Sequence, residues 1–459
     1  MARWTFIALA TSFTLIVIAA AQAGAGLLGH VWRGGFHIAG VGVAGGAVVP
    51  QQPFGAGKAP AWSTTDKAVE QLQVALKSRP DDPLTATRYA QLGSLYLQKV
   101  RETGDPSYYG KAEGVLQQAL ALAPENPLAM LGMGSLALSR HDFAGGIAWG
   151  QRVLAQAPRS YAAYGMLADG YTELGRYDEA VDALQQMIDL RPDQTSYSRV
   201  SYARELHGDL PNAIAAMQQA VASGAPRSEG TNWSRVQLGH LYFTGGDLDA
   251  ADLQYRASLY FLPDYVHGLA GLAKVAAARG DLNQAAHLYN QALAVVPWPE
   301  YAIALGDVYR AMGNEAAAKK QDDLVRLIVQ LQRAAGVDVD LEMALFEADH
   351  APNAAALAAA VQNARAQYER RPSVHVADVL AWTLYRAGRP TEALPYAREA
   401  LRLGSKDPLM LFHAGAVAAA AGERSEATSY LQAALAQNPN FSVRYAPEAT
   451  KLLAQVQKQ

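Results

Sequence analysis

The stretch LADGYTELGRYDEAVDALQQMIDLRPD, residues 167–193, has apolar residues three and four positions apart on both sides of a glycine, and it ends at a proline. Residues with this spacing share one face of a helix, so the stretch predicts two amphipathic helices. Gly175 permits a tight turn between them, and Pro192 ends the second helix. The stretch therefore predicts an antiparallel helix pair.

The same marks recur along the chain from residue 62 onward. The prolines that end the second helices are Pro124, Pro158, Pro192 and Pro226, which follow one another at equal intervals, and then Pro263 and Pro297. The turn glycines are Gly175, Gly208, Gly246, Gly280, Gly313, Gly388 and Gly422. Five positions after each glycine stands a small residue: Ala180, Ala213, Ala251, Ala285, Ala318, Ala393 or Ala427. A repeat as long as the interval from Pro158 to Pro192 predicts stacked helix pairs that cross closely at the alanine.

The period divides the chain into a half unit at residues 66–80 and about ten full units. The units run near 86–126, 127–160, 161–193, 194–231, 232–265, 266–298, 299–340, 341–373, 374–407 and 408–441. The eighth unit lacks the signature glycine in DLEMALFEADHAP. Residues 442–459 contain a polar-faced final helix, which we expect to cap the exposed apolar end of the stack.

The unit resembles the tetratricopeptide repeat. The positions that carry the resemblance in the quoted unit are Tyr164, Leu167, Ala168, Tyr171, Ala180, Leu184 and Pro192. The first helices Leu238-Gly239 with Tyr242, and Leu92-Gly93 with Tyr96, match the family more closely. The resemblance covers residues 62–441. It implies an all-α helical solenoid, a right-handed superhelix of antiparallel helix pairs, whose concave surface binds peptides or proteins without chemistry of its own.

Composition and motifs exclude most other classes of function. The chain has no Cys, which removes disulfides, thiolate nucleophiles and Cys-ligated zinc. A net charge of −3 gives no electrostatic reason to expect nucleic acid. The sequence contains no H-E-x-x-H, G-x-S-x-G or phosphate-binding G-x-x-x-x-G-K-[ST] motif. We therefore expect a protein that is not an enzyme and has no cofactor.

The N-terminus has the pattern of an export signal. Arg3 precedes an apolar run from Trp4 to Ala21, and Ala21-Gln22-Ala23 is a small-x-small site for signal peptidase. Cleavage after residue 23 is favoured over retention as a membrane anchor; either places the rest of the chain outside the cytoplasm, in the periplasm or secreted. Residues 24–61 are rich in Gly and Pro and predict a flexible linker, in which the G-x-G-x-x-G from Gly40 lacks the helix needed for dinucleotide binding.

The resemblance also implies which side chains line the concave groove, because the family lines it from fixed positions of each first helix. Transferred to this sequence, these positions are Tyr202, Glu205, Trp233, His240, Phe243, His267, Lys274, Asp307, Arg310, His375, Asp378, Trp382, Tyr385 and Arg386. Trp and Tyr beside Arg are the usual anchors of a bound peptide. Packing against neighbouring helices is the alternative for some of them, most of all for Trp382 in VLAWTLY. The lysine-and-asparagine set of chaperone-binding members is missing.

Two polar clusters contain residue types that could ligate a metal. The stretch GVDVDLEMALFEADH holds Asp338, Asp340, Glu342, Glu347, Asp349 and His350. Its spacing matches no calcium loop, and acids are favoured at a helix start, so solvated helix ends are the preferred interpretation. His240 and His267 project from successive units, with Glu205 or Asp307 as a further ligand, but hydrogen bonding or stacking is the commoner role of such histidines. No metal is predicted.

These observations predict an exported scaffold or adaptor that binds a protein or peptide partner in its concave groove. One alternative is a metal- or solute-handling accessory of a membrane transporter. Another is a factor for assembly of the envelope or of exopolysaccharide. The sequence does not identify the partner or the oligomeric state.

Overall fold

A computed structural model describes residues 62–458, so the predicted signal (1–23) and linker (24–61) lie outside the described residues. The described part contains 22 α-helices and no strand. Ten antiparallel pairs follow one another. The inner, first helices are α2 (Thr85–Thr103), α4 (Pro127–Ser139), α6 (Tyr161–Glu173), α8 (Gln194–Leu206), α10 (Glu229–Thr244), α12 (Val266–Ala278), α14 (Pro299–Ala311), α16 (Asp340–His350), α18 (Val374–Arg386) and α20 (Pro408–Ala420).

The outer, second helices pack against these and against the next pair. They are α3 (Ser107–Leu122), α5 (Phe143–Gln156), α7 (Tyr177–Leu190), α9 (Leu210–Ser223), α11 (Leu248–Phe261), α13 (Leu282–Val295), α15 (Glu315–Ala334), α17 (Ala354–Arg370), α19 (Pro390–Ala400) and α21 (Arg424–Gln437). α1 (Trp62–Ser78) precedes the first pair, and α22 (Tyr445–Lys458) covers the last. The all-α helical solenoid expected from the sequence is confirmed. Within the described residues, no helix is both long and apolar enough to span a bilayer.

The turn inside a pair is built from a glycine and the residue that follows it. Gly208, Gly246 and Gly280 have φ values of 72°, 81° and 83°, a backbone conformation that glycine adopts without a Cβ penalty. In each case the next residue is an aspartate, whose side chain accepts a hydrogen bond from a backbone N–H three positions on. The Gly-Asp pair therefore reverses the chain and caps the second helix in two residues.

The alanine of each unit lies where its two helices cross. Ala213, Ala251, Ala285 and Ala318 are fully buried, as the close approach of the helices requires. Tyr255 of α11 shows a second kind of close contact, in which a large ring packs against glycines of the two neighbouring first helices, α10 and α12. It packs on the bare faces of Gly239 and Gly271, where an added Cβ would overlap the ring.

We expect Ala285→Trp to destabilise the protein by about 1–3 kcal/mol or more, because the larger side chain must separate α12 from α13. Urea denaturation followed by far-UV circular dichroism measures the change. An unaltered unfolding midpoint would show that the two helices do not cross at residue 285.

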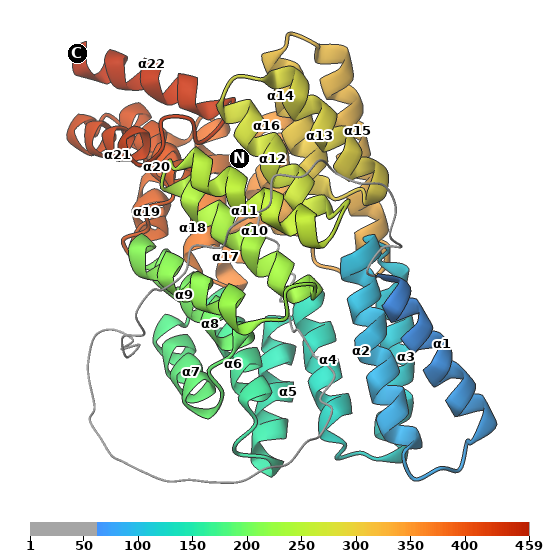
Figure 1. Cartoon of the computed structure of the whole chain (residues 1–459). Coiled ribbons are helices and arrows are strands. Elements are labelled where there is room, and N and C mark those ends of the chain that lie inside the picture. The colour runs from blue at the N-terminus through green and yellow to red at the C-terminus, as the bar shows by residue number, and fades with distance from the viewer. Residues whose placement is uncertain (1–61, 459) are drawn as a thin grey trace.

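The superhelix winds tightly enough for its successive turns to touch. In Figure 1 the chain runs from α1 at the lower right along the lower edge to α7, returns through α10–α12 towards α15, and crosses again to α19–α22. The Nδ1 of His141, between α4 and α5, lies 2.6 Å from the carbonyl oxygen of Asp338. The backbone N–H of Val374 donates to the hydroxyl of Tyr177 at 2.8 Å.

The same offset recurs in the next units. Gly208 lies against the backbone of Gly404, and Asn438 donates its Nδ2 to the carbonyl oxygen of Phe243 at 2.6 Å. Each turn inside one pair thus contacts the junction that follows the pair five units later. Because five consecutive units make such contacts, counting the approach of Gly104 to Val296, the two superhelical turns are stacked edge to edge.

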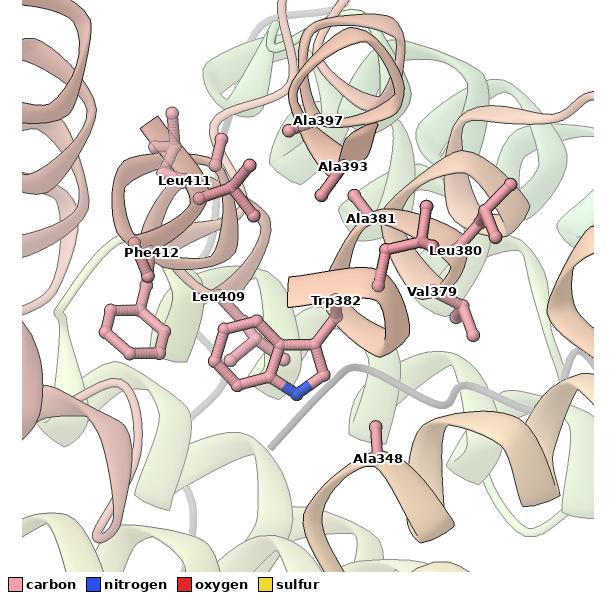
Figure 2. Close-up of a cluster of buried hydrophobic side chains, with 14 of the residues drawn as sticks. Ala348, Val379, Leu380, Ala381, Trp382, Ala393, Ala397, Leu409, Leu411 and Phe412 are labelled. Atoms are coloured by element: carbon pink, nitrogen blue, oxygen red, sulfur yellow. The ribbon is translucent and has the colours of Figure 1, made fainter. Parts of the chain in front are cut away.

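The largest apolar cluster lies in the last three units. Figure 2 shows the ring of Trp382 between Ala348 of α16 and Leu409 and Phe412 of α20. Trp382 is 1 % exposed, and its ring stacks on that of His413 at a centroid distance of 4.1 Å. This cluster continues onto α22 through Tyr445, so the last helix is part of the core of these units.

Candidate functional site: two cavities inside the superhelix

The inner face of α10 is the centre of the candidate site. Trp233, Gln237 and His240 are three and four positions apart, so they project from one face of this helix, and each is half-buried. Val236 and Leu241, beside this stripe, are each 1 % exposed. α10 therefore presents one partly open, mixed aromatic and polar stripe to the interior of the superhelix.

Two cavities meet at this stripe. The central cavity, of about 180 Å³, is lined by α10, α12, α14, α15, α16 and α20 together with Arg101 of α2 and Tyr445 of α22. The side cavity, of about 60 Å³, lies on the inner faces of α6, α8 and α10. Trp233 and Gln237 line both. The inner surface is thus continuous from the third unit to the last helix.

Aromatic and charged side chains share the wall of the central cavity. The aromatic ones are Trp233, Tyr289, Trp298, Tyr301, Phe346 and Tyr445. The charged and titratable ones are Arg101, Glu229, His240, His267, Lys274, Glu300, Asp307, Glu342, Asp349, His350 and His413. A wall of this composition can hold a polar ligand by hydrogen bonds and by its ring faces, as small-molecule sites commonly do.

Burial changes the protonation of several of these groups. Burial raises the pKa of Glu300, at the start of α14, to about 8. Burial lowers the pKa of His267 to about 4, and its Nδ1 lies against the hydroxyl of Tyr301. Burial also raises the pKa of Asp307 to about 6. At neutral pH the cavity therefore holds a neutral imidazole at His267 and a largely protonated carboxyl group at Glu300.

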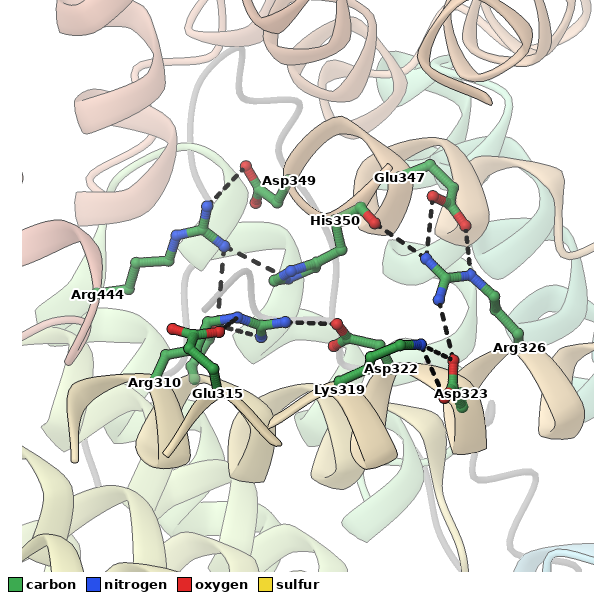
Figure 3. A network of polar contacts seen from close by, with 11 residues as sticks. Arg310, Glu315, Lys319, Asp322, Asp323, Arg326, Glu347, Asp349, His350 and Arg444 are labelled. Carbon is green, nitrogen blue, oxygen red and sulfur yellow. Dashed lines mark hydrogen bonds and ion pairs between the residues drawn. The ribbon is translucent and has the colours of Figure 1, made fainter. Parts of the chain in front are cut away.

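An ion-pair network closes one end of the cavity, where α14, α15, α16 and the start of α22 meet. In Figure 3 the guanidinium of Arg444 lies between Asp349 and His350. Arg444 is 3.5 Å from Asp349 and 3.8 Å from Asp307. Burial opposes ionisation of Asp349, but Arg444 and the hydrogen bond from Tyr445 hold its pKa below the usual value. Ion pairs therefore connect the seventh unit, the eighth unit and the start of the last helix at this end of the cavity.

Seven of the fourteen predicted groove residues line the two cavities. Trp233, His240, His267, Lys274 and Asp307 line the central cavity, and Tyr202, Glu205 and Trp233 line the side cavity. His240 and His267 do not share a ligand: the Nδ1 of His240 lies 2.7 Å from the hydroxyl of Tyr255, and His267 contacts Tyr301. No group of three or more His, Asp or Glu side chains within residues 62–458 is arranged to hold a metal ion.

Three of the other predicted groove residues lie in the packed interior. Phe243 is 3 % exposed and belongs to the core of the fifth to seventh units, with the Lys274 ammonium 4.3 Å above its ring. Trp382 is part of the core described above, and Asp378 is buried beside His413. For these residues packing is the correct interpretation, because the inner faces of consecutive first helices pack on each other here.

Three of the remaining residues serve contacts between elements. His375 meets the hydroxyl of Tyr202 at 3.1 Å, a contact between the two superhelical turns. Arg386 lies 3.7 Å from Asp349 and over the ring of Trp382. Arg310 pairs with Asp322 and lies 3.8 Å from Asp307. Tyr385 is half-buried against Trp382 at a ring distance of 5.0 Å. These side chains stabilise the wall of the interior.

The acidic residues of the stretch 338–350 are less exposed to solvent than the sequence predicts. Asp340 lies at the surface and pairs with Arg333 at 2.7 Å, as expected for a solvated helix start. Glu347, in contrast, is largely covered and pairs with Arg326 at 3.0 Å (Figure 3). Asp349 and Glu342 both line the central cavity. Solvated helix ends are therefore the wrong interpretation for these residues, because the next superhelical turn and α22 cover α16.

Three cavity residues were missed in the sequence. Glu300 follows Trp298-Pro299 at a helix start, where an acidic residue usually lies in solvent. His413 lies in the otherwise apolar stretch PLMLFHAGAVAAA, and it is the only residue there that indicates a polar interior. Glu342 was considered only as part of the acidic stretch. The winding of the superhelix brings these residues together, and no local sequence pattern marks them as neighbours.

We expect the titration of Glu300 to lower the free energy of unfolding by about 1.5 kcal/mol between pH 6.5 and 8. The native state keeps the Glu300 proton up to about pH 8, whereas the unfolded chain loses it near the ordinary value of 4.5, so stability decreases as pH rises. His267 and His350 act in the opposite direction, because burial lowers their native pKa values to about 4 and 3, and only the unfolded chain, with the ordinary value of 6.5, still binds protons at the low end of this window. The contribution of Glu300 is therefore the difference between the parent and a variant that lacks this carboxyl group.

Urea denaturation at pH 6.5 and pH 8 measures this change. The pH-dependent changes of the parent and of Glu300→Gln should differ by about 1.5 kcal/mol, whereas Glu315→Gln, whose side chain is 76 % exposed, should behave as the parent does. An equal change in the parent and in Glu300→Gln would contradict the assignment to Glu300.

Paired helices stacked into a wound array define the class of this protein: a helical repeat solenoid. Tetratricopeptide repeat family models match residues 137–201 and residues 108–161 and 379–442. The chain contains tetratricopeptide repeats at these residues, and proteins with such repeats generally provide scaffolds for protein interaction. No curated protein matches the chain at a significant level.

Solved structures, two of them of tetratricopeptide repeat proteins, are similar to parts of the chain. A repeat protein from Parabacteroides merdae is 14% identical and covers 57% of this chain and 93% of its own, with a TM-score of 0.40. A thermophilic repeat protein from Thermus thermophilus is 22% identical over 45% of this chain and 99% of its own, with a TM-score of 0.34. The type IV pilus biogenesis factor PilW is 17% identical over 44% and 92%, with a TM-score of 0.37.

Proposed function

We propose that this protein is an exported scaffold that binds a protein or peptide partner along the inner surface of its superhelix, outside the cytoplasmic membrane. The observation that carries the proposal is Trp233, a half-buried aromatic side chain at the junction of the two cavities. Large aromatic residues in such positions are the usual anchors of a protein interface, because they bury much apolar area with few rotatable bonds.

The side cavity is the favoured entry for a partner segment. Tyr202 and Glu205 stand on α8, one helix away from Trp233, and give the wall an aromatic and an acidic group. On α6, Asp169 is paired with Arg199 at 2.7 Å, so this part of the wall is fixed before a partner arrives. A pre-formed wall spares the ordering cost that a flexible binder incurs.

Affinity capture from a membrane and envelope extract tests the partner proposal. The chain from Gly24 to Gln459 serves as bait, beside Trp233→Ala and the control Tyr260→Ala. Tyr260 is an aromatic residue of the same unit that is 51 % exposed on the outer helix α11. We expect one protein to be retained by the parent and the control, with about 30-fold weaker binding to Trp233→Ala. Equal retention by all three baits would reject the inner surface as the binding site.

Export is proposed from the sequence of residues 1–23 and has its own test. A tagged full chain produced in bacterial cells should be degraded by protease added to spheroplasts, and it should begin at Gly24 if the signal is cleaved. A deletion of residues 4–21 is the matched control and should leave the protein protected. Protection of the full chain would contradict export while leaving the scaffold role open.

A further inference from the structure

The central cavity contains buried polar atoms without a hydrogen-bond partner among the described residues. Most of them are acceptors: Glu300 Oε2, Glu342 Oε2, Asp307 Oδ1, Gln332 Oε1 and His413 Nε2. Unsatisfied groups of this kind are costly in a folded protein, and several around one cavity indicate that a group outside the described residues pairs with them. We propose that the central cavity is a binding site for a small organic cation that carries several N–H donors, such as a diamine or a guanidine compound.

His413 shows the chemistry of the site most clearly. Its side chain is 1 % exposed, and its Nδ1 lies 3.0 Å from the carboxylate of Asp378. When Nδ1–H donates to Asp378, the lone pair remains on Nε2, which faces the cavity. The Trp382 ring stacked on this imidazole and the Asp378 contact hold the ring in place. His413 therefore presents a fixed acceptor to a ligand N–H.

The charges on the wall favour a cation. Five carboxyl groups line the cavity, at Glu229, Glu300, Asp307, Glu342 and Asp349, against the two cationic side chains of Arg101 and Lys274. Asp307 and Asp349 are accompanied by Arg444, and Glu342 has His141 at 3.7 Å from its other oxygen. Glu300 forms no ion pair with any side chain of residues 62–458. A bound ammonium or guanidinium would supply the missing charge and would let Glu300 ionise.

Aromatic rings and space complete the site. Trp298 and Tyr301 flank Glu300 in the sequence and line the same cavity, so a cation beside this carboxylate also meets ring faces. The cavity volume of about 180 Å³ is roughly 12 to 18 times the 10–15 Å³ that one water molecule requires. A linear diamine or an alkyl guanidine is of suitable size. Arg101 Nε–H is a donor without a hydrogen-bond partner among the described residues, and it lies on the α2 side of the cavity.

Isothermal titration calorimetry of the chain from Gly24 to Gln459 tests the proposal. The probes are 1,4-diaminobutane and agmatine, with tetramethylammonium as a cation without N–H donors and glutamate as an anion. Glu300→Gln and Glu342→Gln remove one acceptor charge each. Glu315→Gln is the matched control on the outer helix α15, where the side chain is 76 % exposed. Thermal melts show that each variant is folded.

We expect a diamine or guanidine probe to bind the parent and the control equally, and each cavity variant to bind at least tenfold more weakly, because a charge-assisted hydrogen bond is lost. Tetramethylammonium should bind more weakly than either donor-bearing cation. No binding of either donor-bearing cation, or equal affinity for the parent and both cavity variants, would overturn the proposal. Stronger binding of glutamate than of the cations would show that the site prefers an anion, and it would also overturn the proposal. The proposal does not depend on the partner proposal, since Glu300 and Glu342 do not line the side cavity.

Discussion

Trp382→Ala is expected to lower the free energy of unfolding by about 3–5 kcal/mol, the range for removing a fully buried aromatic side chain. The indole ring packs on His413, Phe412 and Tyr445 at centroid distances of 4.1, 5.7 and 5.6 Å. Its Nε1 also donates to Asp349 at 3.1 Å. The substitution leaves a cavity and removes a donor from a buried carboxylate, so both the packing and the hydrogen bond are lost.

Urea denaturation followed by far-UV circular dichroism measures this effect, because it does not depend on the fluorescence of the removed indole. Trp382→Phe keeps an aromatic ring but loses the N–H, and it should cost less than the alanine variant. Tyr260→Ala, at an exposed aromatic residue, should change stability by only about 0.5 kcal/mol. A loss below about 1 kcal/mol in Trp382→Ala would show that the last three units do not depend on this ring for their packing.

The helix pairs could be predicted from the sequence because the signals for them are local. A glycine at φ near +80° followed by an aspartate cap needs only two residues to reverse the chain, and it recurs at Gly208, Gly246 and Gly280. The 3.6-residue period of the α-helix then gives the register of each first helix, that is, which of its side chains point to the inner face. Trp233, His240 and His267, which this register assigns to the inner face of their helices, line the central cavity in the structure.

The contacts between superhelical turns could not be predicted in this way. The residues that meet, such as Tyr177 with Val374, are 197 positions apart, and no periodic feature marks them. The same limit applies to the candidate site. Glu300 looks like a solvated residue at the start of a helix, but it lines a cavity to which α16, α20 and α22 also contribute. Sequence patterns describe one unit at a time, whereas the interior depends on how many units complete a turn.

Gly208→Ala is expected to loosen the stack of superhelical turns. A Cβ at this position would overlap the carbonyl oxygen of Gly404, which belongs to the junction between the ninth and tenth units. Because the overlapped atom is backbone, the substitution must separate the two turns or shift the loop. We expect a destabilisation of about 2–4 kcal/mol, the sum of the cost of a non-glycine residue at positive φ and the cost of overpacking.

Gly280→Ala is the control that separates these two costs. Gly280 has the same turn, with φ of 83° and an aspartate cap after it, but nothing lies within 4 Å of an added Cβ. It should therefore lose only about 1–2 kcal/mol, the cost of the backbone conformation. Hydrogen exchange followed by mass spectrometry should show faster exchange near residues 401–410 in Gly208→Ala and unchanged exchange there in Gly280→Ala. Equal destabilisation and equal exchange in the two variants would mean that the stacked turns contribute no stability, because the backbone strain common to both would then account for the whole effect.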